Sequence, residues 1–379
     1  MNNELSDALL LDIIDEKILH NITECYISLK DKAALRKKIF NSLRGLDILE
    51  ELLEDDSITE IMVNGYENIY FERCGFIQKS PLKFASKEDL SNIIQQIVAY
   101  SNRRVNEATP ITDTRLKDGS RVNIVLDPVA INGPIITIRK FADSPLTMER
   151  LIQLGSITKE VADFLEKLVI SGYNIFISGG TSSGKTTFLN VLSNFIPKDE
   201  RVITIEDSAE LSIRGVENLV RLEMRQANVE GTGAITIRDL IRSSLRMRPD
   251  RIVVGEVRGA EALDMLQAMD TGHDGCMSTG HANSAYDMLN RLSTMSLMAM
   301  ELPLAAIKGQ IASALDIIIH LSRMNDRARK VLEISEIEGF DGKDIILNTL
   351  YRYSMQTGLT ATGNKLKHTD KLLRHEFTI

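Results

Sequence analysis

Residues 179–186, with the sequence GGTSSGKT, constrain the fold of this chain more than any other segment. They match the pattern G-x-x-x-x-G-K-[ST], in which glycines let successive backbone N–H groups curl around a phosphate chain. Residues 173–178 before the segment are typical of a buried strand, and residues 187–192 after it open a helix. A strand, a glycine-rich turn and a helix N-terminus in this order predict a nucleoside triphosphate site.

The residue types within the segment match the parts of this chemistry. Lys185 can reach the β- and γ-phosphates, and the hydroxyl of Thr186 can ligate Mg²⁺. The nucleotide-binding residues expected here are Gly179, Gly180, Thr181, Ser182, Ser183, Gly184, Lys185, Thr186 and Thr187.

Composition excludes some classes of protein. The formal net charge is −8, which argues against a general nucleic-acid coat but leaves a local basic channel open. The three cysteines, Cys25, Cys74 and Cys276, are odd in number and far apart, as expected in a reducing compartment. No apolar run approaches the length of a membrane span, and the N-terminus lacks the positive start of a signal peptide.

Three regions follow one another along the chain. We expect a helical segment over residues 1–46, an α+β domain over 47–144 and a larger α/β domain over 145–379. Within the second region the expected elements are a hairpin of strands 58–63 and 68–73, a helix from 86 to about 103, and strands 121–126 and 135–141.

In the third region, strands and helices alternate, which predicts a mostly parallel sheet. The expected elements are a helical stretch at 148–170, strands at 174–178, 201–206 and 251–255, and an antiparallel pair at 315–323 and 328–340. The polar stretch from 357 to 379 is expected to be poorly ordered.

Acidic residues follow two of these strands. Glu206 ends one strand ahead of two more acids, and Glu256 follows the next strand. Carboxylates at the C-terminal ends of parallel strands point into the crevice where a nucleotide lies, where they can hold Mg²⁺ or polarise the attacking water. Many such sites have an aspartate before the glutamate, but here that position is Gly255, so the work falls to Glu256. A solvated acidic loop is the competing interpretation of the group around Glu206.

A segment rich in small residues, 271–284, contains His273, Cys276 and His281. Zinc is a weak interpretation, because a structural site usually needs four convergent ligands and no others lie nearby in sequence. His281, among small residues after a predicted strand, is a candidate contact for the γ-phosphate, whereas a satisfied buried histidine is the simpler alternative.

The glycine-rich loop, the acidic box 205–210, the strand end 255–258 and the box 280–284 occur in the order found in one superfamily. The chain resembles the secretion ATPases, the motors of type II and type IV secretion and of type IV pili. Three upstream segments, 56–65, 118–123 and 136–141, resemble the CpaF-type ATPases of tight-adherence (Tad) pilus assembly.

The resemblance implies a RecA-like P-loop NTPase domain preceded by a smaller α+β sensor-like domain, assembled as a homohexamer. It implies ATP as substrate, Mg²⁺ as cofactor held by Thr186 and Glu256, and catalytic roles for Glu256, Glu206 and Lys185. Which of the two glutamates is the general base stays open. The positions that match phosphate-contacting residues are Arg121, Arg139, Arg242, Arg246 and His281, with His273 near the start of that box and Arg115 a weaker candidate. Surface salt bridges are the alternative role for each arginine.

The resemblance further implies a cytoplasmic motor that acts on a polytopic inner-membrane platform protein to assemble a pilus or secrete protein, without nucleic acid as a partner. The main alternative is a RecA-like DNA translocase or helicase, which DNA-stimulated hydrolysis would reveal. A small-molecule kinase, which needs an acceptor pocket, and an ATP-gated scaffold without hydrolysis are further alternatives.

Overall fold

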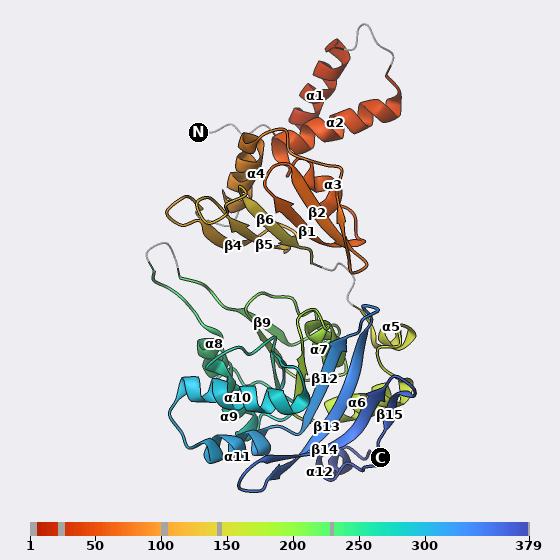
Figure 1. Ribbon diagram of the computed structural model, residues 1–379, viewed down its shortest axis with the longest axis vertical. Coiled ribbons are helices and arrows are strands. Elements are labelled where there is room, and N and C mark those ends of the chain that lie inside the picture. Colours follow the sequence, from red (N-terminus) through yellow and green to blue (C-terminus); the bar gives the residue numbers. More distant parts are fainter. Residues whose placement is uncertain (1–5, 22–26, 100–104, 142–145, 228–230, 378–379) are drawn as a thin grey trace. The chain divides into compact units, whose positions relative to one another are not determined.

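The structure, a computed structural model, describes residues 6–21, 27–99, 105–141, 146–227 and 231–377 (Figure 1). The chain divides into two compact units, residues 1–143 and 144–379, which are treated separately below. Cys25 and residues 100–103, the end of one expected helix, lie outside the described residues.

Unit 1 is an antiparallel sheet with helices. Its strands are β1 (Ile58–Asn64), β2 (Asn68–Arg73), β3 (Phe76–Lys79), β4 (Ile111–Arg115), β5 (Arg121–Val125) and β6 (Ile135–Arg139), in the order β3-β2-β1-β6-β5-β4. Its helices are α1 (Asp7–Asn21), α2 (Leu29–Arg44), α3 (Leu49–Leu53) and α4 (Lys87–Ala99). The expected hairpin is β1–β2, and β3 and β4 are edge strands that the sequence patterns did not reveal.

Buried and more exposed residues alternate along the strands of unit 1, so the sheet has one buried face. Val122 and Ile124 of β5 and Ile136 and Ile138 of β6 are buried in one core with α4. The residues between them face the other side, where Arg121 pairs in register with Arg139 and with Arg115 of β4. Two of the arginines expected to contact phosphate are therefore neighbours on one face.

Unit 2 has a nine-stranded sheet in the order β15-β14-β13-β12-β7-β11-β10-β8-β9. The six strands from β12 to β9 in this order are parallel. Beyond β12, the strands β13, β14 and β15 extend the sheet, each antiparallel to the strand before it. The strands are β7 (Ile175–Gly179), β8 (Val202–Glu206), β9 (Leu219–Glu223), β10 (Arg251–Val254), β11 (Met277–His281), β12 (Ile317–Arg323), β13 (Arg329–Phe340), β14 (Ile345–Ser354) and β15 (Gly358–Ala361).

Two cores cover the two faces of this sheet. Neighbouring residues of β7 divide between them, with Ile175 and Ile177 in one core and Phe176 in the other. The first core contains α5 (Met148–Gln153), α6 (Lys159–Ile170) and α7 (Lys185–Ser193). The second contains α8 (Ile237–Ser244), α9 (Glu261–Asp270), α10 (Ala285–Ala299) and α11 (Leu304–Ala314). Helices on both faces of a mostly parallel sheet define an α/β fold, whose ligand crevice lies at the carboxyl ends of the strands.

The helical stretch expected at 148–170 is two helices. Gly155 adopts a φ of 66°, which ends α5, and the Thr158 side chain accepts a hydrogen bond from the N–H of Val161 to begin α6.

The expectation of poor order beyond residue 357 is wrong through residue 377. This stretch forms β15 and α12 (Asp370–Arg374), and Leu372 is 1% exposed. The buried Glu336 carboxylate accepts hydrogen bonds from the N–H groups of Lys367 and His368. Tertiary partners of this kind stabilise a segment whose own pattern is irregular.

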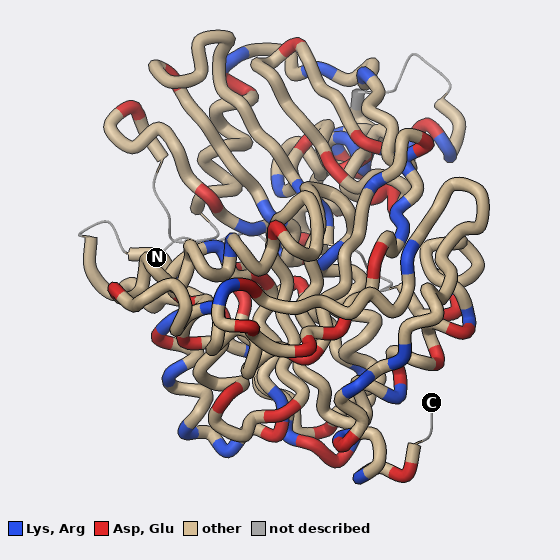
Figure 2. The backbone as a smooth tube through the Cα atoms, turned by 60° about the horizontal axis from the view of Figure 1, so that its bottom comes forward, with Lys and Arg blue, Asp and Glu red and all other residues tan. Residues whose placement is uncertain are grey.

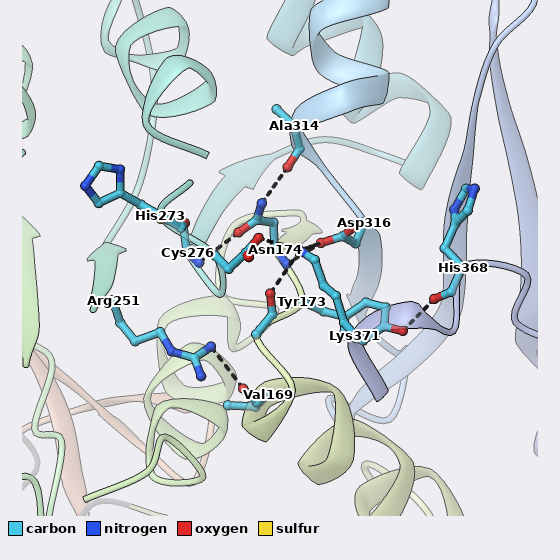
Figure 3. Close-up of polar contacts among 12 residues, drawn as sticks. Val169, Tyr173, Asn174, Arg251, His273, Cys276, Ala314, Asp316, His368 and Lys371 are labelled. Carbon is cyan, nitrogen blue, oxygen red and sulfur yellow. Dashed lines mark hydrogen bonds and ion pairs between the residues drawn. The ribbon is translucent and has the colours of Figure 1, made fainter. Parts of the chain in front are cut away.

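Lys371 connects the segment 357–377 to residues at the amino ends of three central strands through polar contacts. Its ammonium donates to Gly172 O (3.1 Å), just before β7, and contacts Asp316 (2.8 Å) before β12 and Asp274 (2.8 Å) before β11. Figure 3 shows Lys371 beside Asp316 and Tyr173, whose hydroxyl donates to the carbonyl of His368. This end of the strands is opposite the phosphate loop, which begins at the carboxyl end of β7.

Candidate nucleotide-binding site

The glycine-rich segment forms the turn between β7 and α7. Gly184 precedes the helix with a φ of 92°, and Ser182 has a φ of 57°, so the loop uses left-handed backbone on both sides of Ser183. Gly179 is required sterically, because a Cβ there would lie 2.5 Å from both the carbonyl oxygen of Leu321 and Ser183 Oγ. No side chain caps α7 at Gly184, which leaves the first N–H groups of the helix for an anion.

Lys185 is held inside the loop by its own neighbours. The residue is 6% exposed, and its Nζ donates to the carbonyl oxygen of Gly180 at 3.0 Å. The same Nζ lies 3.2 Å from Nδ1 of His281. Thr186 and Thr187 follow in the first turn of α7, as the motif requires of a metal-ligating hydroxyl.

His281 and Glu256 meet because β11 lies between β7 and β10 in the sheet. His281 ends β11, and its Nε2 is 2.9 Å from Oε1 of Glu256, at ion-pair distance but not aligned as a hydrogen bond. Arg258 donates to the other oxygen of Glu256 at 2.8 Å and lies 3.5 Å from Asp207. Burial lowers the pKa of His281, as Lys185 does, and these effects outweigh the opposing charge of Glu256, which favours a neutral imidazole.

Glu206 ends β8 in a buried position, at 2% exposure. Its Oε1 accepts hydrogen bonds from the N–H groups of Glu210 and Leu211, each at 2.8 Å. Burial raises its pKa from 4.5 to about 7, although the two backbone N–H groups oppose the rise. Its Oε2 is buried and has no hydrogen-bond partner among the described residues.

The structure explains the glycine at position 255, where the sequence lacks the usual aspartate. A Cβ on Gly255 would lie 3.1 Å from Cγ of Glu206, a tight contact. A side chain at position 255 would therefore crowd Glu206. Glu256 and Glu206 both bring a carboxylate to this edge of the sheet, from the ends of the neighbouring strands β10 and β8.

These oxygens fit Mg²⁺, which usually takes one or two protein ligands together with phosphate oxygens and water. Thr186 and Glu256 would hold the ion, and the unsatisfied Oε2 of Glu206 is a third hard oxygen at the same edge. For zinc the structure gives no support, since within the described ranges no cluster of three His, Cys, Asp or Glu residues is arranged to hold a metal.

The expected arginines are distributed differently. Arg242 donates to Asp264 of α9 at 2.7 Å, and Arg238 contacts the other oxygen of that buried carboxylate, so the salt-bridge alternative describes Arg242 within this chain. Arg246 follows α8 on the surface. Arg121 and Arg139 belong to unit 1, and their approach to a phosphate stays a prediction.

Arg329 is a site residue that the sequence did not reveal. It begins β13, and its Nε donates to the carbonyl oxygen of Ser182 at 3.0 Å. Its side chain covers Gly184, where a Cβ would be 3.2 Å from Cδ of Arg329. No signal in the sequence links this arginine to the loop, because almost 150 residues separate them.

A cavity of about 260 Å³ lies beside the loop. Its walls include Gly184 and Thr187 from the loop and α7, Leu151 and Leu154 from α5, and Arg329 from β13. Apolar walls next to a phosphate loop suit a flat ring system attached to a phosphate chain.

Comparison with known proteins gives consistent results. A family model described as type II/IV secretion system protein matches residues 42–371. A putative conjugal transfer protein of Mycobacterium tuberculosis is 34% identical over 307 residues, which cover 79% of this chain and 87% of that protein. The type IV secretion system protein PtlH of Bordetella pertussis is 32% identical over 315 residues, covering 76% of this chain and 93% of its own.

Two solved structures share the fold. The pilus retraction motor PilT with bound ADP aligns over 87% of this chain and 88% of its own, with a TM-score of 0.57 and 19% identity. The ATPase DotB of Legionella pneumophila aligns over 75% and 78%, with a TM-score of 0.54 and 21% identity. The expected fold class is confirmed: a RecA-like P-loop domain preceded by a smaller α+β domain and an N-terminal helical segment.

Proposed function

The chain belongs to the type II/IV secretion system protein family, as its motifs predicted, and from this premise we propose that it is a Mg²⁺-dependent ATPase that converts hydrolysis into mechanical work. One observation carries the proposal: the phosphate loop, His281 and the carboxylates of Glu256 and Glu206 lie together at one edge of the sheet.

Each part has a role in phosphoryl transfer, which depends mainly on positioning and charge. The N–H groups from Gly179 to Thr187 hold the phosphates, and Lys185 supplies positive charge to them. Bound Mg²⁺ would neutralise charge on the phosphate oxygens. Glu256 is the better placed general base, because its side chain is 14% exposed and can receive water. Glu206 is buried and holds the following loop through Glu210 and Leu211.

The mechanical part of the proposal concerns the assembly. We propose a homohexamer in which Arg121 or Arg139 of unit 1 contacts the nucleotide, so that loss of the γ-phosphate releases unit 1. This motion would act on a polytopic platform protein at the inner face of the cytoplasmic membrane, in pilus assembly of the Tad or type IV-like kind or in protein secretion. In the described part of the chain, no helix is both long and apolar enough to cross a membrane.

The first experiment is an ATPase assay of the wild type, Lys185→Ala and Glu256→Gln with Mg²⁺ and with EDTA. Loss of one positioned base typically costs about a hundredfold or more in rate, so Glu256→Gln should bind ATP and hydrolyse it very slowly. Full turnover by Lys185→Ala would refute the site. If Glu206→Gln is inactive and Glu256→Gln is normal, Glu206 is the base.

A DNA translocase is the second candidate, since the relative from Mycobacterium tuberculosis is named a putative conjugal transfer protein. Figure 2 shows acidic and basic positions interspersed along the chain, and the net charge is −8, so neither supports a strand-tracking surface. Adding single-stranded and duplex DNA to the ATPase assay separates the candidates, because stimulation at physiological salt favours a DNA motor.

The proposed hexamer is tested separately, by sedimentation of the protein with and without nucleotide.

A further inference from the structure

His281 joins two residues that act on different parts of the nucleotide. Its Nδ1 is 3.2 Å from the ammonium of Lys185, and its Nε2 is 2.9 Å from a carboxylate oxygen of Glu256. The ring thus lies between the phosphate-binding lysine and the acid at the end of β10. Lys185 donates at the same time to the carbonyl oxygen of Gly180, so its ammonium is engaged within the protein.

The two partners assign the proton on the ring. A lysine ammonium has donors only, so Nδ1 must accept from Lys185. The proton is then on Nε2, which faces the carboxylate of Glu256, an acceptor. In this neutral tautomer Nδ1 accepts from Lys185, and Nε2–H lies at ion-pair distance from Glu256 without the alignment of a hydrogen bond.

Glu256 has a second anchor that does not involve the loop. Arg258 donates to its other oxygen at 2.8 Å and approaches Asp207 at 3.5 Å. If Lys185 leaves His281, the contacts of Glu256 with His281 and Arg258 are still in place. A phosphate that binds Lys185 therefore competes with the contact between Lys185 and His281, and it does not require Glu256 to leave Arg258.

We propose that His281 acts as a latch on Lys185: its Nδ1 accepts from the ammonium and competes with the phosphates of a nucleotide for that donor. The proposal rests on the proposed function only in taking a nucleoside polyphosphate as the ligand. His281 competes for Lys185 and weakens binding of every nucleotide whose β-phosphate reaches the lysine. If His281 contacted only the γ-phosphate, its removal would leave the affinity for ADP unchanged, because ADP has no γ-phosphate.

ADP is therefore the probe that distinguishes the two roles, and binding is measured by titration calorimetry on the full chain without turnover. His281→Phe keeps the ring volume between Lys185 and Glu256 but removes the acceptor, and His281→Ala serves as a second variant. One hydrogen bond of this kind corresponds to a change of about fivefold, so both variants should bind ADP about fivefold more tightly. His273→Ala is the matched control, since His273 is near Thr271, outside the site, and should leave ADP affinity unchanged.

Unchanged or weaker ADP binding in both His281 variants overturns the latch, whatever the hydrolysis rates are. Tighter ADP binding in these variants supports it even if the wild type proves unable to hydrolyse ATP, which would refute the proposed function instead. Circular dichroism of both variants confirms that the affinities refer to folded protein.

Discussion

Glu206→Gln tests the buried carboxylate through the pH dependence of stability. Burial raises the pKa of Glu206 from 4.5 to about 7 in the folded protein. Because the folded state binds the proton more tightly than the unfolded state, this carboxyl contributes stability below pH 4.5 and loses it as the pH rises through 7. At about 1.4 kcal/mol per pH unit the full effect is about 3 kcal/mol, of which about 2.5 kcal/mol falls between pH 5 and 9.

Glutamine cannot ionise, yet its carbonyl oxygen can still accept from the N–H groups of Glu210 and Leu211. The difference in unfolding free energy between wild type and variant should therefore move by about 2.5 kcal/mol in favour of the variant from pH 5 to pH 9. Urea denaturation in EDTA at five pH values measures it, as a relative shift of about 1 M in the midpoint of the unit 2 transition. The exposed Glu217→Gln, in the same stretch of chain, is the control. Parallel pH profiles for wild type and Glu206→Gln would refute the reasoning.

Substitutions at three other positions and one truncation have definite expected outcomes. Arg329→Ala should raise KM for ATP about fivefold with little change in kcat, because it removes the hydrogen bond to Ser182. Arg329→Lys should not restore KM, since its ammonium cannot donate from the position of Nε, and a wild-type KM in this variant would show that charge alone suffices. Gly255→Asp should lower stability by about 2 kcal/mol and reduce turnover, because its Cβ would meet Glu206 at 3.1 Å; a thermal melt and an ATPase assay check it, and faster hydrolysis would contradict the steric argument. Arg121→Ala should lower ATPase activity, and a fragment beginning at residue 145 should be slower than the full chain; equal rates would mean that unit 1 takes no part in hydrolysis.

The parts of the site that the sequence predicted are those that are local in the chain. The loop from Gly179 to Thr186 is one contiguous motif, and Gly184 within it adopts a φ of 92°, a backbone conformation that other residues rarely adopt. The sequence also predicted the antiparallel pair β12–β13, because a turn at 325–326 separates the two strands. The strand β9 was missed because its residues are only partly buried. The strand β11 was expected near His281 but without bounds, because its sequence, MSTGH, contains only one large apolar residue.

The parts that the sequence did not predict depend on contacts between distant residues. The missing aspartate at 255 was visible, but its reason, the side chain of Glu206, lies on a neighbouring strand. The order of segment 357–377 was not predicted for a similar reason. Its order depends on Glu336, a charged residue that is buried because the N–H groups of Lys367 and His368 satisfy it. Whether residues 1–46 act as a separate segment stays a prediction.

Strand order decides which of the motifs can act on each other. In the chain the phosphate loop comes first, then Glu206, Glu256 and finally His281, but in the sheet the order is β7-β11-β10-β8. The last motif in sequence is thus the nearest neighbour of the loop, and the second is the farthest away. This arrangement is why Lys185 contacts His281, 96 residues away, and why Glu206 acts on Gly255 and its own loop. A change at His281 should therefore affect both Lys185 and Glu256, whereas a change at Glu206 should reach Lys185 only through Glu256.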